Sequence, residues 1–405
     1  MNEFIASGIE SDIENEEMAA GRLNLRYYFR QQPVMLAVVL VLVVIAFLFV
    51  TALSHAYHAQ REALGARWSS RGLVDLKAKN FPAAVTEFRS ALLYSRDDYD
   101  YQLNLAEALL GLKRAGAGSS YGEASAYLIN LWDREPENGL VNLELARITA
   151  QQGETTEAIR YYHDAVNAVW PADQENMRRD ARFELIDLLL RVNEKAQAQA
   201  ELIALSENAA SDPALRERIA ALFDRAQDYD HALAAYRLAL RSDEHNESAL
   251  AGAGHAAFEL GRYPLAQHYL RSALALDPND QASAELLKTT ELVLNTDPFR
   301  EDISTAQRDR LAVEAFTTAG DRLQSCAVPK TQVPGPAGLE PGLNDEWDSI
   351  KSRVTEAGLR RDPDLLNVVM DLVFRIERHT STLCGAPTGK DLALLLIAKS
   401  HEGSN

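Results

Sequence analysis

The feature that most constrains the fold is a pattern of small and aromatic residues that returns about every 34 positions across residues 66–278. This segment is rich in Ala and Leu and has almost no β-branched alternation, so it predicts helices and not strands. The last unit is the clearest and consists of Leu250, Ala253, Gly254, Ala257, Gly261, Tyr263, Ala266, Leu270, Ala273 and Pro278. No single unit can bury its apolar face alone, so we expect stacked helix pairs.

This register resembles that of the tetratricopeptide repeat family, whose consensus places Leu-Gly, an aromatic residue, Ala, a second aromatic residue, Ala and Pro along two antiparallel helices. The first unit fits it with Trp68, Gly72, Ala84, Phe88 and Ala91. The resemblance covers about half the chain and implies a solenoid of about six repeats at residues 63–296. An insertion at 113–122 is expected to loop out of the second repeat, and a helix at 281–294 is expected to cap the last one.

A long apolar run precedes the repeats. No Asp, Glu, Lys or Arg occurs between Arg30 and Arg61, and the centre of this run has the roughly twenty apolar residues that a helix needs to cross a bilayer. The alternative is a cleavable signal peptide, whose apolar region has about 7 to 15 residues and whose leading segment is short. Because about thirty mostly polar residues come first, we predict an uncleaved, single-pass transmembrane helix at residues 33–54.

The orientation of this helix is predicted from its flanking arginines. Arg22, Arg26 and Arg30 precede the run, and Arg61, Arg67 and Arg71 follow it. The arginines before the run lie closer to it than those that follow it. Because positive residues near a span favour the cytoplasmic side, this favours a cytoplasmic N-terminus and a C-terminal body outside the cytoplasm. The leading segment, residues 1–32, is acidic and lacks helical apolar spacing, so we predict a solvated tail, with a docking peptide as the alternative.

The region after the repeats, residues 297–405, predicts a small helical module with a Pro- and Gly-rich linker at 327–345. Its two cysteines, Cys326 and Cys384, are the only ones in the chain. They are compatible with a disulfide, with two free thiols, or with a metal site that includes His379 or His401. We favour the disulfide if the module is exported, since ligands for a metal are not clustered. The whole chain is thus predicted to be all-α.

Composition and motifs argue against two classes of function. The formal net charge of -18 disfavours nucleic-acid binding, which depends on Lys and Arg displacing counterions. No Gly-x-Ser-x-Gly, His-Glu-x-x-His or paired-cysteine motif occurs, and the loop at 385–391 lacks the spacing of a phosphate-binding loop. We therefore predict no catalytic residues, no cofactor and no metal, and a chain that is not an enzyme.

The resemblance implies that the first helices of successive repeats line a groove that receives other proteins. The groove positions of the family fall here on Leu103, Glu107, Leu143, Arg147, Phe183, Asp187, Arg191, Glu217, Arg225, His255 and Phe258. The family members that clamp an acidic tail use Lys and Asn where this chain has Ser69 and Leu73, so that mode is disfavoured. The prediction is a membrane-anchored scaffold for cell-envelope proteins. The alternatives are a structural subunit of a larger membrane complex, or a C-terminal ligand-binding or enzymatic module that the repeats position.

Overall fold

The computed structural model describes residues 3–116, 121–207, 212–326 and 342–402, and within 3–34 it describes the backbone alone. These residues form eighteen α-helices and one short 3-10 helix, and no strand occurs among them. The chain divides into two compact units, Met1–Pro171 and Ala172–Asn405. The predicted all-α class is confirmed.

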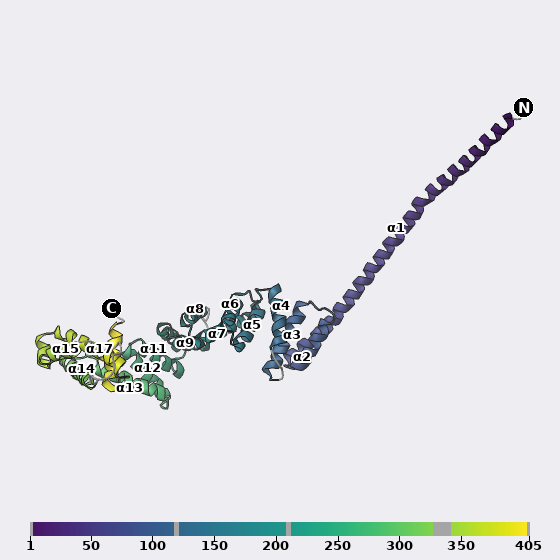
Figure 1. The fold of residues 1–405 in the computed structure, drawn as a ribbon. Helices are drawn as coiled ribbons and strands as arrows, with labels where there is room; N and C mark the ends of the chain where they lie inside the picture. Colours follow the sequence, from purple (N-terminus) through teal and green to yellow (C-terminus); the bar gives the residue numbers. More distant parts are fainter. Residues whose placement is uncertain (1–2, 117–120, 208–211, 327–341, 403–405) are drawn as a thin grey trace. The chain divides into compact units, whose positions relative to one another are not determined.

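The first unit contains three helix pairs, each helix packed on the next (Figure 1). Its helices are α1 (Glu3–Lys77), α2 (Phe81–Leu92), α3 (Tyr99–Arg114), α4 (Gly122–Arg134), α5 (Gly139–Gln152) and α6 (Thr155–Asn167). Between α3 and α4 the chain leaves the helical register, as the insertion at 113–122 predicted, and residues 117–120 lie outside the described ranges.

Helix α1 is a single helix of 75 residues that runs from the acidic segment through the apolar run into the first repeat. Its backbone is helical from Glu3, although the sequence of this segment lacks helical apolar spacing, and the solvated tail at residues 1–32 stays a prediction. From Met35 to Lys77 the helix includes a window with a mean hydropathy of 3.3 and no buried residue. A helix of this kind crosses a bilayer or serves as a signal sequence.

The second unit begins with the short η1 (Ala172–Gln174) and continues with three further helix pairs. These are α7 (Glu175–Arg191) with α8 (Lys195–Glu207), α9 (Pro213–Arg225) with α10 (Tyr229–Leu240), and α11 (Glu247–Glu259) with α12 (Tyr263–Leu276). Together the two units contain the six pairs that the repeat register predicted.

Small and large residues fit together inside the pairs as the register predicted. A Cβ added to Gly72 would lie 2.9 Å from the Phe88 ring, and one added to Gly254 would lie 2.7 Å from the side chain of Leu270. Because the large side chain fills the space left by the missing Cβ, the two helices can approach closely.

The C-terminal module continues the core of the last repeat. It consists of α14 (Thr305–Cys326), α15 (Leu343–Lys351), α16 (Glu356–Arg361), α17 (Leu365–Leu383) and α18 (Gly389–Glu402), and α13 (Gln281–Thr296) joins it to the repeats. Helix α13 was predicted to cap the solenoid, but α18 packs on it, and the Tyr263 hydroxyl donates a hydrogen bond to the Leu396 carbonyl at 3.2 Å. Core residues therefore run from Tyr263 through Leu294 to Ile397 without interruption.

The predicted linker at 327–345 falls mostly outside the described residues, which stop at 326 and resume at 342. Its last part is helical, because α15 begins at Leu343. Leu343 and Trp347 are buried, and Trp347 stacks on Phe316 with ring centroids 5.3 Å apart. This packing explains why the helix begins before the predicted end of the linker.

Candidate functional site

The candidate groove of the second unit lies on the first helices of its repeats, α7, α9 and α11. Its charged side chains pair with one another between neighbouring repeats. Arg225 on α9 donates to Asp187 on α7 at 2.9 Å, and His255 on α11 lies 2.9 Å from Asp224 on α9 through its Nδ1 atom. The first helices are therefore tied together by ion pairs on the face that was predicted to receive a partner.

His255 is the titratable group of this face that responds most directly to its neighbours. The hydrogen bond to Asp224 raises the pKa of His255 above its ordinary value, against the opposing effect of burial. The carboxylate of Glu259 lies 3.9 Å from the other ring nitrogen and adds a smaller effect in the same direction. The imidazole is thus held between two carboxylates, which favour its charged form.

The predicted groove residue Glu217 also pairs within the protein. Its carboxylate accepts a hydrogen bond of 2.8 Å from the side-chain amide of Asn246, which at the same time caps the N-terminus of α11 through the backbone N–H of Ala249. Glu217 therefore steadies the turn between two repeats, and its charge is partly compensated there.

The candidate groove of the first unit carries a buried carboxylate cluster. Glu144 on α5 is buried and accepts from Arg114 on α3 at 2.5 Å and from Arg147 on its own helix at 2.7 Å. Burial, and then the negative charge of Glu144, raise the pKa of Glu107 to about 7, against the opposing charge of Arg114. Glu107 therefore exchanges its proton near neutral pH.

Two of the predicted groove residues face the interior instead. Leu143 has no exposed surface and Phe183 is 2 % exposed, so the prediction that they contact a partner is wrong. The guanidinium of Arg218 lies 3.7 Å from the centre of the Phe183 ring and covers it. The prediction failed because the repeat register gives only the face of a helix on which a residue lies. How much of that face is buried depends on the neighbouring repeats.

Two more predicted residues are partly buried. Leu103 packs against the core of the second repeat, and Phe258 packs against the core shared by the last repeat and the C-terminal module. Arg191, at the end of α7, is exposed. Within the described part of the chain no side-chain partner of Arg191 is found, so it is the groove residue best placed to meet another protein.

Sequence reasoning missed several of the charged residues that pair on the first helices. Glu144, Asp224 and Arg114 were not singled out, although each belongs to an acid–base pair one repeat apart, as Arg225 and Asp187 are. A search for opposite charges about 30 to 38 positions apart on first helices is the signal that would have found them.

The two cysteines are brought together at the far end of the C-terminal module. Cys326 ends α14, Cys384 follows α17, and they form a disulfide whose Cα atoms are 5.8 Å apart, within the usual range. Arg322, one turn before Cys326, donates to the carbonyl of Gly385, which follows the other cysteine. The disulfide thus closes the base of a packed helix pair. No group of His, Cys, Asp or Glu able to hold a metal ion occurs in the described ranges.

Stacked antiparallel helix pairs with small and large residues in register define an all-α repeat protein. Residues 70–118 and 114–173 match the model of the family described as tetratricopeptide repeat, so this segment consists of tetratricopeptide repeats. Proteins of this family are in general interaction scaffolds and not enzymes.

Three solved structures are among those similar to parts of this chain. YrrB, a tetratricopeptide-repeat protein with an unusual peptide-binding site, is 16% identical, with 50% of this chain and 97% of that chain covered and a TM-score of 0.40. The structure of pilF of Pseudomonas aeruginosa is 17% identical, with 56% of this chain and 99% of that chain covered and a TM-score of 0.39. PilW, a widely conserved type IV pilus biogenesis factor, is 14% identical, with 56% of this chain and 98% of that chain covered and a TM-score of 0.36. A comparison with curated proteins gave no match.

Proposed function

We propose that this chain is a membrane-anchored scaffold that holds other proteins of the cell envelope on the first helices of its repeats. The observation that carries the proposal is the continuity of α1, in which an apolar, unpacked helix and the first repeat helix are one element. A water-exposed apolar surface of this length is costly, and burial in a bilayer removes that cost.

A body outside the cytoplasm is part of the proposal. The disulfide between Cys326 and Cys384 supports it, because such bonds persist in oxidising compartments and are rare in the cytosol. The orientation is tested with a membrane-impermeant maleimide added to intact cells. We expect both cysteines to be labelled only after reduction, and labelling only after lysis would place the body in the cytoplasm.

Each unit has its own proposed binding face, made of its exposed and partly exposed groove residues: Glu107 and Arg147 in the first unit, and Asp187, Arg191, Glu217, Arg225 and His255 in the second. Ion pairs between Arg147 and Glu144, between Arg225 and Asp187, and between His255 and Asp224 give polar faces of both signs. Such a face suits a partner that forms backbone contacts and exchanges a few charges. Ion pairs that are partly exposed contribute little to stability, so a partner can replace them at small cost.

The scaffold function is tested by placing a photo-crosslinking amino acid at Arg191 in the full chain in cells. Ile203, which is also exposed but lies on the second helix α8, is the matched control position. We expect defined adducts with one or a few envelope proteins from position 191 and none of them from 203. Identical patterns at the two positions, or no adduct at either, would overturn the proposed use of the first helices.

A further inference from the structure

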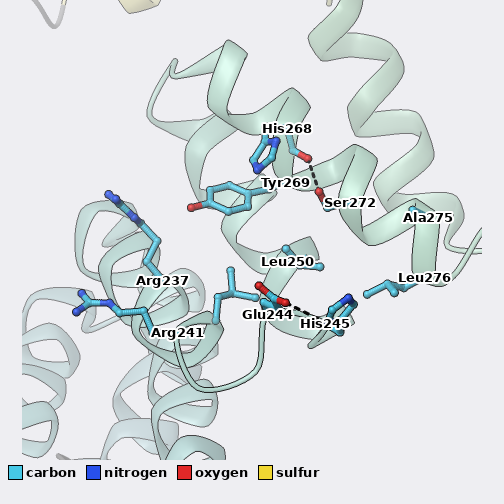
Figure 2. A pocket seen from close by; sticks show the side chains of 11 residues that line it. Arg237, Arg241, Glu244, His245, Leu250, His268, Tyr269, Ser272, Ala275 and Leu276 are labelled. Carbon is cyan, nitrogen blue, oxygen red and sulfur yellow. Dashed lines mark hydrogen bonds and ion pairs between the residues drawn. The ribbon is translucent and has the colours of Figure 1, made fainter.

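An open pocket of about 950 Å³ lies in the second unit between α10, the turn that follows it, the first turn of α11, and α12 (Figure 2). Helices α10 and α12 are the second helices of two successive repeats, and none of the predicted groove residues on α7, α9 and α11 lines the pocket. The pocket is therefore a different surface from the proposed groove, and sequence reasoning did not predict it.

One wall of the pocket carries two arginines. Arg237 lies on α10, and Arg241, one turn later, is the C-cap residue of that helix. Figure 2 shows both side chains at the edge of the pocket, on the side toward which the Tyr269 hydroxyl of α12 points. Neither guanidinium forms a hydrogen bond or ion pair with any residue that the structure describes. By contrast, the nearby Arg262 and Arg271 pair with carboxylates at 3.0 and 2.7 Å.

These two charges stand out against the composition of the chain, which has 59 acidic and 41 basic residues. Elsewhere on the repeats Arg89 pairs with Glu123 and Arg225 pairs with Asp187. The single acid that lines the pocket, Glu244, lies in the turn, 3.9 Å from His245. His268 on the opposite wall adds a second imidazole. The pocket is thus a local cationic site on an acidic protein.

The floor and outer rim of the pocket are apolar. Leu250 is buried at its base, and Leu276 at the end of α12 is 41 % exposed. An apolar floor beside two guanidinium groups fits a ligand that carries both an apolar side chain and carboxylates. A phosphate ion alone would occupy only a small part of about 950 Å³ and would leave this apolar surface in water.

We propose that this pocket binds an extended acidic peptide segment of a partner protein, with carboxylates on Arg237 and Arg241 and an apolar side chain on Leu250 and Leu276. Guanidinium groups form the strongest hydrogen bonds with carboxylates because both partners are charged and the fork of N–H groups matches the two oxygens. Tyr269 is placed to cover the peptide from the opposite wall. This inference goes beyond the proposed function and does not depend on the groove.

The test measures binding of a fluorescein-labelled peptide with the sequence Glu-Glu-Leu-Glu-Glu-Leu-Glu-Glu to the full chain in neutral detergent micelles. Fluorescence anisotropy gives the Kd, and the same peptide with Gln for every Glu is the ligand control. We expect R237Q/R241Q to weaken binding about tenfold or more, and binding of the unchanged protein to weaken as salt rises.

Two further variants keep the result interpretable. R310Q/R361Q removes the same charge from exposed arginines on α14 and α16 and should change the Kd less than about twofold. Leu276→Glu leaves both arginines in place, adds a carboxylate at the exposed rim and should repel the peptide. The proposal is overturned if the Gln peptide binds with the same Kd as the Glu peptide, or if R237Q/R241Q binds the Glu peptide with the Kd of the unchanged protein. Displacement of the peptide by equimolar inorganic phosphate would also overturn it.

The outcome is separable from the proposed function. Crosslinking from position 191 on α7 reports on the groove, and it should be unchanged in R237Q/R241Q. Loss of peptide binding with intact crosslinks would support both proposals, and intact peptide binding in R237Q/R241Q would overturn the pocket while leaving the groove proposal standing.

Discussion

Replacing Glu377 by glutamine removes a carboxyl group that has no exposed surface in the core of the C-terminal module. Glu377 lies on α17, and Arg322 of α14 lies 3.5 Å from it and 3.6 Å from Asp391 on α18. Arg322 also donates to the Thr380 hydroxyl at 2.8 Å. No residue of the described chain forms a hydrogen bond with either oxygen of Glu377. One guanidinium group therefore faces two carboxyl groups and cannot compensate both.

The pKa of Glu377 rises from its ordinary 4.5 to about 8, because of burial first and the charge of Asp391 second, with Arg322 opposing. Between these values the folded state binds more protons than the unfolded state, so the free energy of unfolding falls as the pH rises. A shift of this size corresponds to at most about 5 kcal/mol. Some relaxation around the charge reduces it, so we expect Glu377→Gln to exceed the parent in stability by about 2 to 5 kcal/mol near pH 9. Near pH 4 the two should be nearly equal.

The assay is urea unfolding of the full chain in micelles between about pH 4 and pH 9. The signal is the ¹⁹F resonance of 5-fluorotryptophan at Trp347, which is buried in the core that the C-terminal module shares with the last repeat and reports on the unfolding of that core. Each pH gives a midpoint and a slope, and hence a free energy of unfolding for the module.

Glu285→Gln is the matched control, because the side chain of Glu285 on α13 is 78% exposed and pairs only at 3.8 Å with Lys288. Its pH profile should follow that of the parent. Parallel profiles for Glu377→Gln and the parent across this range would refute the reasoning, since they would mean that Glu377 takes up no extra proton on folding.

Two other variants extend the same logic. In the parent, the free energy of unfolding should fall between about pH 4.5 and 7, because the pKa of Glu107 is raised to about 7, and Glu107→Gln in the first unit should remove this fall. Since the residue is partly exposed, we expect the variant to gain only about 1 to 2 kcal/mol in the free energy of unfolding near pH 8. Circular dichroism during urea unfolding measures the gain, and an unchanged pH profile would mean that Glu107 takes up no extra proton on folding. Cys326→Ser with Cys384→Ser opens a loop that spans a sequence separation of 58 and should cost about 4 kcal/mol, as should reduction of the parent. A stability insensitive to both changes would exclude the bond.

The sequence predicts the fold well where one residue decides the contact. Gly72 and Phe88 stand in a repeat register because a Cβ at 72 would meet the ring, so their spacing alone indicates a helix pair. Burial is different, because it depends on neighbouring repeats. Leu143 was placed in the groove by register, yet α5 is covered so fully that even Glu144 beside it is buried.

The candidate site and the pocket were predicted less completely for a related reason. The pairing of Asp224 with His255 requires that two helices a repeat apart have a particular offset and that both side chains adopt matching rotamers. The pocket arises from the space between α10 and α12 and not from a motif, so no local pattern marks Arg237 or Arg241. The relative placement of neighbouring repeats is therefore the feature that a single sequence predicts least well.

The continuity of α1 limits where a partner can be met if the helix spans the membrane as proposed. The first repeat is already engaged at Arg61, whose side chain donates to the Leu93 carbonyl at 2.8 Å, and at Gly65, which lies against Tyr101. From the predicted end of the span at residue 54, a helix rises only about 10 Å before position 61. With no flexible linker in between, the first repeat is held within about two helical turns of the bilayer surface. Proteins that contact the first repeat must then be membrane-proximal themselves, which favours membrane-bound envelope proteins over freely diffusing ones as partners at this end of the first unit.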